Sequence, residues 1–311
     1  MKTPDTAAIC EELRSRLAEA VKRNATEGIL FSGGLDTSLL ALLSPGIPAL
    51  SVRLAGYGED AKYAEMLAQR LGLELHLKQV SPEEALAVIP EVIKILGSFD
   101  PALPNDLALF FALKLSREKG LGSVITGDGA DELFAGYSYM FDLDLEDYLP
   151  KLSQRMVFSS SEIGSYLGVE VKQPFLDDEF VSFALAIKPD LKVREQNGKR
   201  YGKWLLRQAF ATFLPPEIIW QEKRPIEIGS GFTRLREIIS SRVSDREFAE
   251  AESSYPVRFL SKDHLVYYQI YRRVVGEIPP PQPGEVICPG CGTGIKASSF
   301  HCRICGWSRK P

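Results

Sequence analysis

A glycine-rich turn near the N-terminus constrains the fold of this chain more than any other stretch. Residues 29–40 read ILFSGGLDTSLL, in which an apolar segment typical of a buried strand leads through a glycine pair into a helix-like segment. Gly33 and Gly34 let the backbone turn tightly and approach an anion closely, and the amides that open the following helix carry partial positive charge. This order predicts a phosphate-binding turn in an α/β protein.

The side chains of this turn indicate a metal-bound phosphate group. Hydroxyl donors are available from Ser32, Thr37 and Ser38. Asp36 cannot bind phosphate itself, and we expect it to ligate Mg²⁺. The turn lacks the lysine of the P-loop pattern and the third glycine of a dinucleotide-binding fingerprint. For this stretch alone, an ordinary strand-to-helix connection remains the alternative.

A second stretch, residues 124–137, repeats the same order. VITGDGADELFAGY runs from a short apolar segment through two glycines, Gly127 and Gly129, into a cluster of carboxylates. Acidic side chains beside a phosphate would repel it unless a metal ion lies between them. The two stretches together therefore predict a Mg²⁺-nucleotide held between two loops. The cluster consists of Asp128, Asp131 and Glu132.

The pair SGGLDTS and GDGADELFAGY resembles the synthetase domain of the asparagine synthetase and β-lactam synthetase family, which belongs to the PP-loop ATP pyrophosphatases. The resemblance implies a parallel twisted sheet flanked by helices, of the adenine nucleotide α-hydrolase-like type, followed by a helical second half. The alternation of strand-like and helix-like segments independently predicts a parallel sheet with its ligand at the carboxyl ends of the strands. Pro90 is expected to kink or divide one of the helices.

The resemblance also implies a reaction. Attack of a carboxylate on the α-phosphate of ATP gives an acyl-adenylate and pyrophosphate, and a nitrogen nucleophile then forms an amide. Lys223, in WQEKRP, matches the family's catalytic lysine, and Asp128 takes the place of an acid that receives or deprotonates the amine. Asp36 and Asp131 are the expected Mg²⁺ ligands. The expected ATP-binding residues are Ser32, Gly33, Gly34, Asp36, Thr37, Ser38, Val52, Gly127 and Asp131.

Two departures from the family pattern bear on the substrates. Residues 168–177, GVEVKQPFLD, carry Lys172 where the family usually has Arg, and an ammonium does not replace a forked guanidinium. The carboxylate substrate is therefore not identified. Glutamine-dependent members begin with a glutaminase domain whose nucleophile is a Cys after the initiator Met, whereas Lys2 stands here. We expect the chain to use free ammonia or an amine.

The last part of the chain carries a separate metal motif. Residues 277–285, EIPPPQPGE, are predicted to form an extended linker between an enzyme domain of residues 1–276 and a zinc ribbon of residues 286–311. Two CxxC pairs supply four thiolates for one tetrahedral Zn²⁺, without which so small a segment could hardly fold. An iron–sulfur cluster is the alternative. The expected ligands are Cys288, Cys291, Cys302 and Cys305.

Composition narrows the class of protein further. The 311 residues are 45% hydrophobic and 25% charged, with a net charge of −4, as in soluble globular proteins. No apolar run is long enough to span a bilayer, and the first residues lack the apolar core of a signal peptide. We therefore expect a cytoplasmic enzyme. The acidic balance argues against a strongly nucleic-acid-binding body.

Three functions fit these patterns. The favoured one is an ATP-dependent amide-forming ligase. The second is a tRNA-modifying pyrophosphatase whose ribbon grips RNA through Lys296, Arg303, Arg309 and Lys310 with Phe300 and Trp307 available to stack. Cys10, the only cysteine outside the ribbon, is expected to be a buried thiol, which weakens a sulfur-transfer role. The third is a non-enzymatic nucleotide-binding module whose ribbon docks a partner protein. For the ribbon itself, docking to a protein and contact with RNA are equally open alternatives.

Overall fold

A computed structural model describes residues 6–57, 61–196 and 198–309, without the side chains of residues 61–63. Lys310, one of the residues predicted to bind RNA, lies outside the described residues. The chain folds into two compact units, each assembled from separate segments. The first comprises Met1–Ser51, Glu59–Lys78 and Ala112–Arg224, and the second comprises Val52–Gly58, Gln79–Phe111 and Pro225–Pro311. The boundaries expected at residues 276 and 286 stay a prediction.

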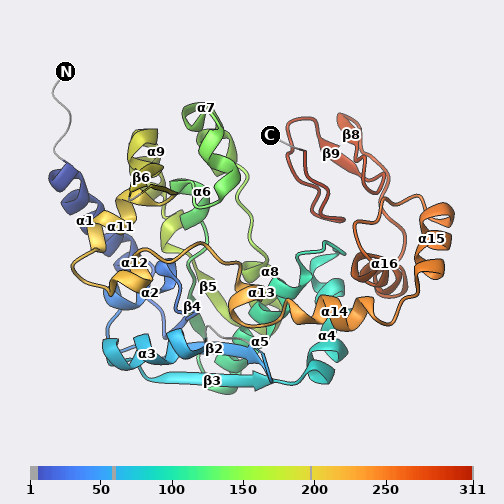
Figure 1. Cartoon of the computed structure of the whole chain (residues 1–311), viewed down its shortest axis with the longest axis horizontal. Helices are drawn as coiled ribbons and strands as arrows, with labels where there is room; N and C mark the ends of the chain where they lie inside the picture. The colour runs from blue at the N-terminus through green and yellow to red at the C-terminus, as the bar shows by residue number, and fades with distance from the viewer. Residues whose placement is uncertain (1–5, 58–60, 197, 310–311) are drawn as a thin grey trace. The chain divides into compact units, whose positions relative to one another are not determined.

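A five-stranded sheet forms the centre of the fold, in the order β3-β2-β1-β4-β5 (Figure 1). Strand β1 runs parallel to β2 and β4, and β4 runs parallel to β5. The predicted parallel sheet flanked by helices is therefore confirmed. The strands are β1 Gly28–Leu30, β2 Ala49–Leu54, β3 Leu75–Val80, β4 Ser123–Ile125 and β5 Glu170–Lys172.

The strand order places the two glycine-rich loops beside each other. In the register of β1 and β4, Gly28 lies opposite Val124 and Ile29 opposite Ile125. The chain leaves β1 toward β2 on one side and leaves β4 toward β5 on the other, so the order of strands reverses between β1 and β4. Open α/β sheets bind ligands at such a point, outside the carboxyl ends of the strands.

Most helices of the first unit bury their apolar stripes in one core, and α7 contributes Leu145 and Leu149 to a second, smaller cluster. In α1, Leu13, Leu17 and Val21 pack in a cluster with Ile29 and Phe31 of the first strand region. Cys10 is buried beside them, and burial raises the pKa of its thiol. The helices are α1 Thr6–Arg23, α2 Leu35–Leu43, α3 Ala61–Leu71, α6 Ala130–Phe134, α7 Leu145–Ser153, α8 Ser159–Leu167, α9 Asp178–Ala186, α10 Pro189–Lys192, α11 Trp204–Phe210 and α12 Pro216–Ile219.

Short elements complete the first unit. They are the 3-10 helices η1 Ser138–Asp142 and η2 Pro174–Leu176 and an antiparallel hairpin of β6 Arg194–Gln196 with β7 Lys199–Tyr201. The hairpin ends one residue before the Gly202-Lys203 pair that leads into α11. It therefore sets where α11 begins.

The second unit is mainly helical, with an aromatic core in which Phe99 packs against Tyr268, Tyr271 and His264. Helix α4 packs on α16 and continues through Pro90, so of the two expected effects of this proline, a kink or a division, the division does not occur. Both ends of α4 are capped, by Ser81 and by Gly97, which stabilises the helix despite the missing amide. The elements are α4 Pro82–Leu96, α13 Ile226–Gly229, α14 Arg234–Ser240, α15 Asp245–Ser254, α16 Lys262–Val274, β8 Glu285–Ile287 and β9 Gly294–Lys296, with α5 Leu103–Glu118 shared by both units.

Candidate active site

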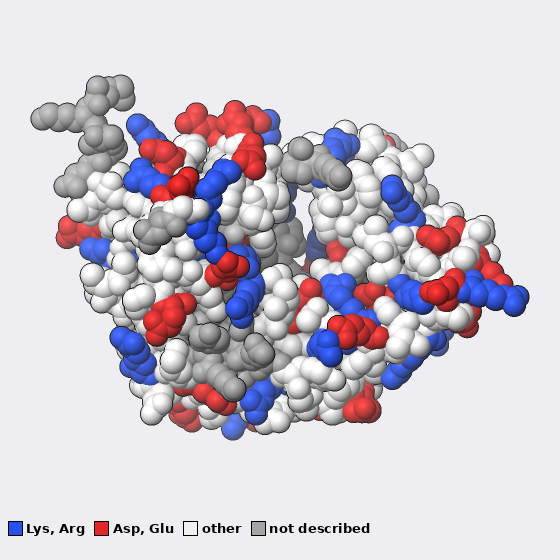
Figure 2. Space-filling model, in the orientation of Figure 1, with Lys and Arg blue, Asp and Glu red and all other residues white. Residues whose placement is uncertain are grey.

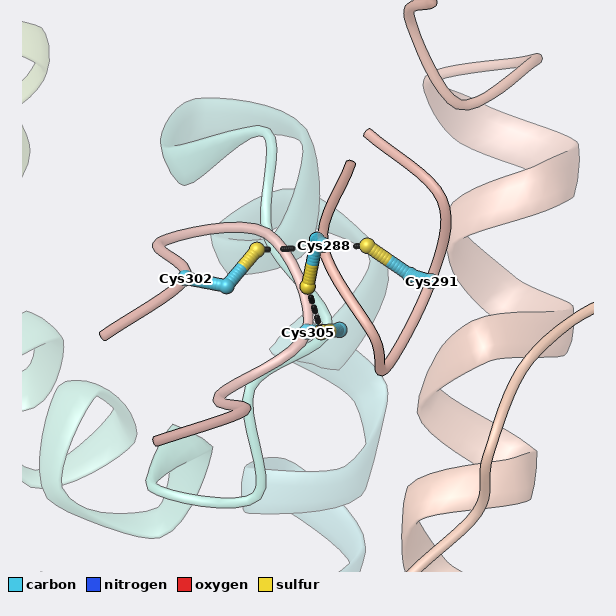
Figure 3. Close-up of side chains that lie close together, drawn as sticks. All are labelled: Cys288, Cys291, Cys302 and Cys305. Atoms are coloured by element: carbon cyan, nitrogen blue, oxygen red, sulfur yellow. Dashed lines mark hydrogen bonds between the residues drawn. The ribbon is translucent and has the colours of Figure 1, made fainter. Parts of the chain in front are cut away.

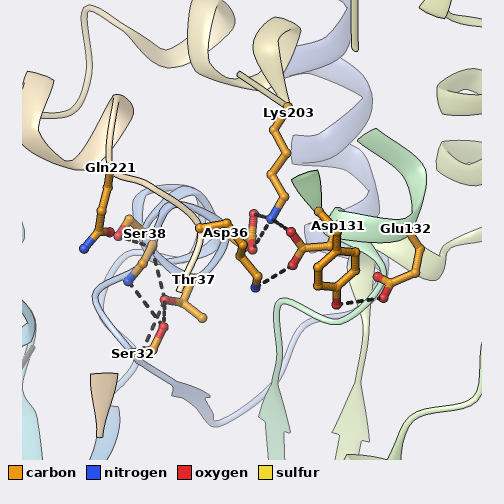
Figure 4. A network of polar contacts seen from close by, with 12 residues as sticks. Ser32, Asp36, Thr37, Ser38, Asp131, Glu132, Lys203 and Gln221 are labelled. Carbon is orange, nitrogen blue, oxygen red and sulfur yellow. Dashed lines mark hydrogen bonds and ion pairs between the residues drawn. The ribbon is translucent and has the colours of Figure 1, made fainter. Parts of the chain in front are cut away.

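The first loop follows β1 and opens α2 as predicted. Gly33 adopts the left-handed conformation with φ of 73°, and a Cβ there would lie 2.9 Å from the backbone nitrogen of Ala64. The hydroxyls of Ser32 and Thr37 lie 3.1 Å apart, and Ser32 is exposed. Ser38 is fully buried, and its hydroxyl donates to the Gly34 carbonyl at 2.6 Å. The Thr37 hydroxyl also donates to the Gly34 carbonyl, at 3.3 Å. Thr37 and Ser38 thus hold the loop together, and Ser32 presents its hydroxyl at the loop surface (Figure 4).

The second loop follows β4 and lies against the first. A Cβ on Gly127 would come within 2.9 Å of the Asp36 Cβ, so only glycine permits this approach without displacement. A Cβ on Gly136 would lie 1.8 Å from the Asp131 Oδ1 and 2.6 Å from the Lys203 Cε. The glycines of the second loop therefore make room for side chains that converge from elsewhere in the first unit.

Lys203 lies at the centre of the site, and the sequence did not identify it. Its Nζ donates to Asp36 at 2.8 and 2.7 Å and lies 2.6 Å from the Asp131 Oδ1 (Figure 4). The side chain is 3% exposed, and its backbone is left-handed with φ of 55°. Its amide donates to the Phe134 carbonyl at 2.8 Å. The strained backbone aims the lysine inward, as strain at functional sites often does.

Lys223, predicted as catalytic, reaches the same carboxylate. Its Nζ lies 2.7 Å from the Asp131 Oδ2 and 5.6 Å from the centre of the Tyr137 ring. Burial alone would raise the pKa of Asp131, but the charges of Lys203 and Lys223 outweigh it and lower that pKa. Burial opposes the charge on Lys223, yet the nearby carboxylates raise the pKa of the amine. Both groups are therefore ionised at neutral pH.

Glu132 is the carboxylate of this cluster that holds its proton most tightly. Burial and the charge of Asp131 raise the pKa of Glu132 to about 7. The hydroxyl of Tyr137 donates to the Glu132 Oε1 at 3.2 Å. Burial raises the pKa of that tyrosine, so it stays neutral. The site therefore changes its net charge near neutral pH at Glu132.

A stability measurement tests this assignment. Between about pH 4.5 and pH 7 the unfolded chain releases the Glu132 proton while the folded chain retains it, so this residue lowers stability as pH rises. The substitution Glu132→Gln removes this pH-dependent loss of stability. The difference in free energy of unfolding between this variant and wild type should be larger at pH 8 than at pH 4.5 by roughly 3 kcal/mol. Thermal unfolding without nucleotide or Mg²⁺ measures this, and exposed Glu146→Gln is the control. An equal difference at both pH values would contradict the assignment.

Asp128 is fixed by hydrogen bonds to one of its two oxygens. The Oδ2 atom accepts from three side chains, the Ser160 hydroxyl at 2.6 Å, the Thr126 hydroxyl at 2.7 Å and the Gln173 amide at 2.9 Å. No hydrogen bond to its Oδ1 occurs within the described part of the chain. Asp128 thus offers one free acceptor oxygen, in an orientation that three neighbours hold.

Two other predicted positions lie outside this network. Val52 is a buried residue of β2, and its contact with adenine stays a prediction. Lys172 ends β5 and pairs with the Glu170 carboxylate at 2.5 Å. Its ammonium is therefore engaged by a residue of its own strand and does not join Lys203 and Lys223 at Asp131.

The carboxylates fit a metal ion. Asp36 and Asp131 face one cation, the Lys203 ammonium, from two different loops. The Asp131 Oδ1 is buried and forms an ion pair with the Lys203 ammonium that lacks hydrogen-bond geometry. This oxygen is open to a further ligand. Oxygen donors from two carboxylates are typical of Mg²⁺ sites that also bind phosphates.

The four cysteines of the C-terminal segment come together as predicted (Figure 3). Their Sγ atoms all lie within 4.8 Å of one another, with 3.7 Å between Cys288 and Cys305 and 3.9 Å between Cys291 and Cys302. A tetrahedron with Zn–S distances of about 2.3 Å places sulfurs roughly 3.8 Å apart. The cluster therefore fits a tetrahedral zinc ion.

The cysteine-bearing segment packs firmly within the second unit. The Phe99 amide donates to the Ile304 carbonyl at 2.7 Å, and the Arg258 amide donates to the Gly290 carbonyl at 2.8 Å. The His301 Nε2 lies 2.8 Å from the Asp100 Oδ2, so this histidine binds a carboxylate instead of completing the metal site. Within each CxxC pair, one backbone carbonyl thus accepts a hydrogen bond from a backbone amide outside the cysteine-bearing segment.

Surface charge gives no sign of a nucleic-acid interface on the face in view. Figure 2 shows positive and negative side chains interspersed there, in keeping with the net charge of −4. Within the described residues, no helix is long and apolar enough to cross a membrane.

Comparison with known proteins shows to which family the chain belongs. The asparagine synthase family model matches residues 12–167 and 142–277, and the chain belongs to this family. A probable glutamine-hydrolyzing asparagine synthetase from Dictyostelium discoideum is 29% identical over 80% of this chain and 51% of its own length. Asparagine synthetase B from Escherichia coli, also described as glutamine-hydrolyzing, is 27% identical over 93% of this chain and 57% of its own.

The chain thus spans about half the length of the curated relatives it matches. Among solved structures, the U34-tRNA thiolase NcsA from Methanococcus maripaludis aligns over 93% of this chain and 85% of its own. Its sequence identity is 14% and its TM-score 0.30, too low to support an argument about function.

Proposed function

We propose that this chain is an ATP-dependent carbon–nitrogen ligase that adenylates a carboxylate and transfers the acyl group to ammonia or an amine. The observation that carries this proposal is the convergence of Lys203 and Lys223 on Asp131, beside the glycine-rich loop that bears Asp36. Two cations and two phosphate-binding turns suit a reaction in which negative charge builds up on phosphate oxygens.

The proposed first step forms an acyl-adenylate. A carboxylate oxygen attacks the α-phosphorus, the bond to the β-phosphate breaks, and pyrophosphate leaves with the electron pair. Donors of the first loop, Ser32 and Thr37 with the amides of Gly33 and Gly34, hold the departing phosphates. The ammonium of Lys223 stabilises charge on the α-phosphate. When bound at Asp36 and Asp131, Mg²⁺ supplies charge neutralisation of the β- and γ-phosphates.

The proposed second step forms the amide. The nitrogen attacks the acyl carbonyl, AMP leaves, and the surplus proton is taken from the nitrogen. Asp128 suits that acceptor because its Oδ2 is held by three donors while its Oδ1 has no hydrogen bond within the described residues. Lys223 would stabilise the tetrahedral intermediate. The zinc ion proposed for the four cysteines serves folding, because all four are buried and leave no open position.

The substrates are inferred from the relatives. Those relatives are named asparagine synthetases, so aspartate is the first carboxylate to test and asparagine the first product. The use of ammonia or an amine remains part of the proposal, since the chain matches only about half of proteins described as glutamine-hydrolyzing.

The test is release of AMP and pyrophosphate from Mg²⁺-ATP in the presence of aspartate with ammonium, of other small carboxylates, and of bulk tRNA. Release with a small carboxylate is expected. Release with tRNA alone would overturn the ligase proposal and favour the RNA-modifying alternative.

A further inference from the structure

Arg207 is a buried cation that lies outside the carboxylate network. It belongs to α11, is 5% exposed, and lies with its guanidinium 5.4 Å from the centre of the Tyr201 ring. Within the described part of the chain, no carboxylate forms a hydrogen bond or ion pair with it. A buried guanidinium without a carboxylate requires strong acceptors, and backbone carbonyls provide them here.

The first carbonyl belongs to the residue before Lys203. The Arg207 Nε donates to the Gly202 carbonyl at 2.9 Å. Gly202 is packed so closely on the second loop that a Cβ would lie 2.0 Å from the Ala135 carbonyl oxygen. Arg207 therefore holds the backbone at the point where Lys203 enters the left-handed conformation.

The other two carbonyls belong to the segment that leads to Lys223. The Arg207 Nη1 donates to the carbonyl of Ile219, in a short contact, and to the carbonyl of Gln221 at 3.1 Å. These residues lie four and two positions before Lys223. A single guanidinium thus joins the backbone that immediately precedes Lys203 to the backbone that precedes Lys223.

We propose that Arg207 is a positioning residue that fixes the Lys203 and Lys223 ammonium groups relative to each other at Asp131. The inference rests on the proposed function for its kinetic consequences but not for its structural ones. The planar fork of arginine reaches separated acceptors at once, whereas a lysine ammonium is a single point. The two lysines share Asp131, so their separation determines where the Lys223 ammonium lies relative to the phosphate charge that it stabilises.

The kinetic test is Arg207→Lys, which keeps the charge. We expect kcat for pyrophosphate release to fall about 100-fold, the cost of a small displacement of catalytic groups. The KM for ATP should change little, because no hydrogen bond joins Arg207 to the first loop within the described residues. In a Lys223→Ala background the same substitution should cost no more than about 3-fold, since the group it positions is gone. Equal losses in both backgrounds would overturn the proposal and indicate a general folding role.

The matched control is Arg14→Lys. Arg14 of α1 also donates to a backbone carbonyl of α11, that of Ala209 at 2.7 Å, and its guanidinium lies over the Phe213 ring. Within the described residues, no hydrogen bond joins Arg14 to the backbone next to Lys203 or to residues 219–221, which precede Lys223. The control should retain kcat within about 2-fold, because substitutions away from the reacting groups have small effects.

Amide hydrogen exchange provides a readout that needs no activity. In Arg207→Lys, residues 218–224 should exchange at least about 10-fold faster, because local opening is easier once two carbonyls lose their donor. Residues 35–43 of α2 should not change. Unchanged exchange in residues 218–224 would overturn the inference. Faster exchange in a protein that releases no pyrophosphate with any carboxylate would uphold it and reject the proposed function instead.

Discussion

Replacing Lys223 with alanine should lower pyrophosphate release by about 10³-fold, because preorganised donors in a closed site contribute that much to charge stabilisation. The Lys223 ammonium pairs with the Asp131 Oδ2 and lies near the Tyr137 ring, so it is already placed beside the second glycine-rich loop without a ligand. Alanine leaves Lys203 in contact with Asp131, and the fold should therefore survive. Single-turnover formation of pyrophosphate from Mg²⁺-ATP and aspartate measures the effect.

Lys199→Ala is the matched control for this experiment. Lys199 forms an ion pair with Glu222, the residue before Lys223, but it is an exposed side chain of the β7 strand. Exposed ion pairs contribute little, so its rate should stay within about 2-fold of wild type. The catalytic assignment of Lys223 would be wrong if both variants, Lys223→Ala and Lys199→Ala, retained more than a tenth of the wild-type rate.

Replacing Cys302 with serine should abolish binding of the zinc ion proposed for the four cysteines. A zinc site of this type contributes about 10–16 kcal/mol in isolated zinc-finger peptides, so a segment this short is not expected to stay folded without it. The Phe99 and Arg258 amides would then lose the Ile304 and Gly290 carbonyls, their acceptors in the segment. We expect bound zinc to fall from one ion per chain to nearly none, and both amides to lose protection from exchange.

Cys10→Ser is the control, because Cys10 is a buried thiol of α1 remote in sequence from the four-cysteine group. It should retain the full zinc content. Native mass spectrometry gives the stoichiometry, and exchange at Phe99 and Arg258 reports the structure. A metal-free Cys302→Ser protein with both amides still protected would show that packing alone holds the segment.

The sequence predicts the parts of the site that depend on chain order. Glycine pairs directly after two strands place Asp36 and Asp131 at the carboxyl ends of β1 and β4, and a parallel sheet brings such ends together. The spacing of Cys288, Cys291, Cys302 and Cys305 likewise predicts one four-thiolate cluster, which the structure contains.

The parts that the sequence does not predict depend on tertiary packing. Lys203 reaches Asp36 and Asp131 only because its backbone is left-handed and Gly202 packs against Ala135, and no local pattern encodes either feature. Of the two effects expected at Pro90, the division of α4 also does not occur, because capping and packing on α16 override a local preference.

Transfer of oxygen from substrate to nucleotide tests the central claim most directly. If the chain adenylates a carboxylate, aspartate labelled with ¹⁸O in its side-chain carboxylate should pass one labelled oxygen to AMP when the amide forms with ammonium. Mass spectrometry of the released AMP reads this out, with Lys223→Ala as the inactive control. Labelled AMP, released with pyrophosphate, is the result that we predict. Formation of ADP, or of AMP without label while amide accumulates, would contradict the proposed reaction.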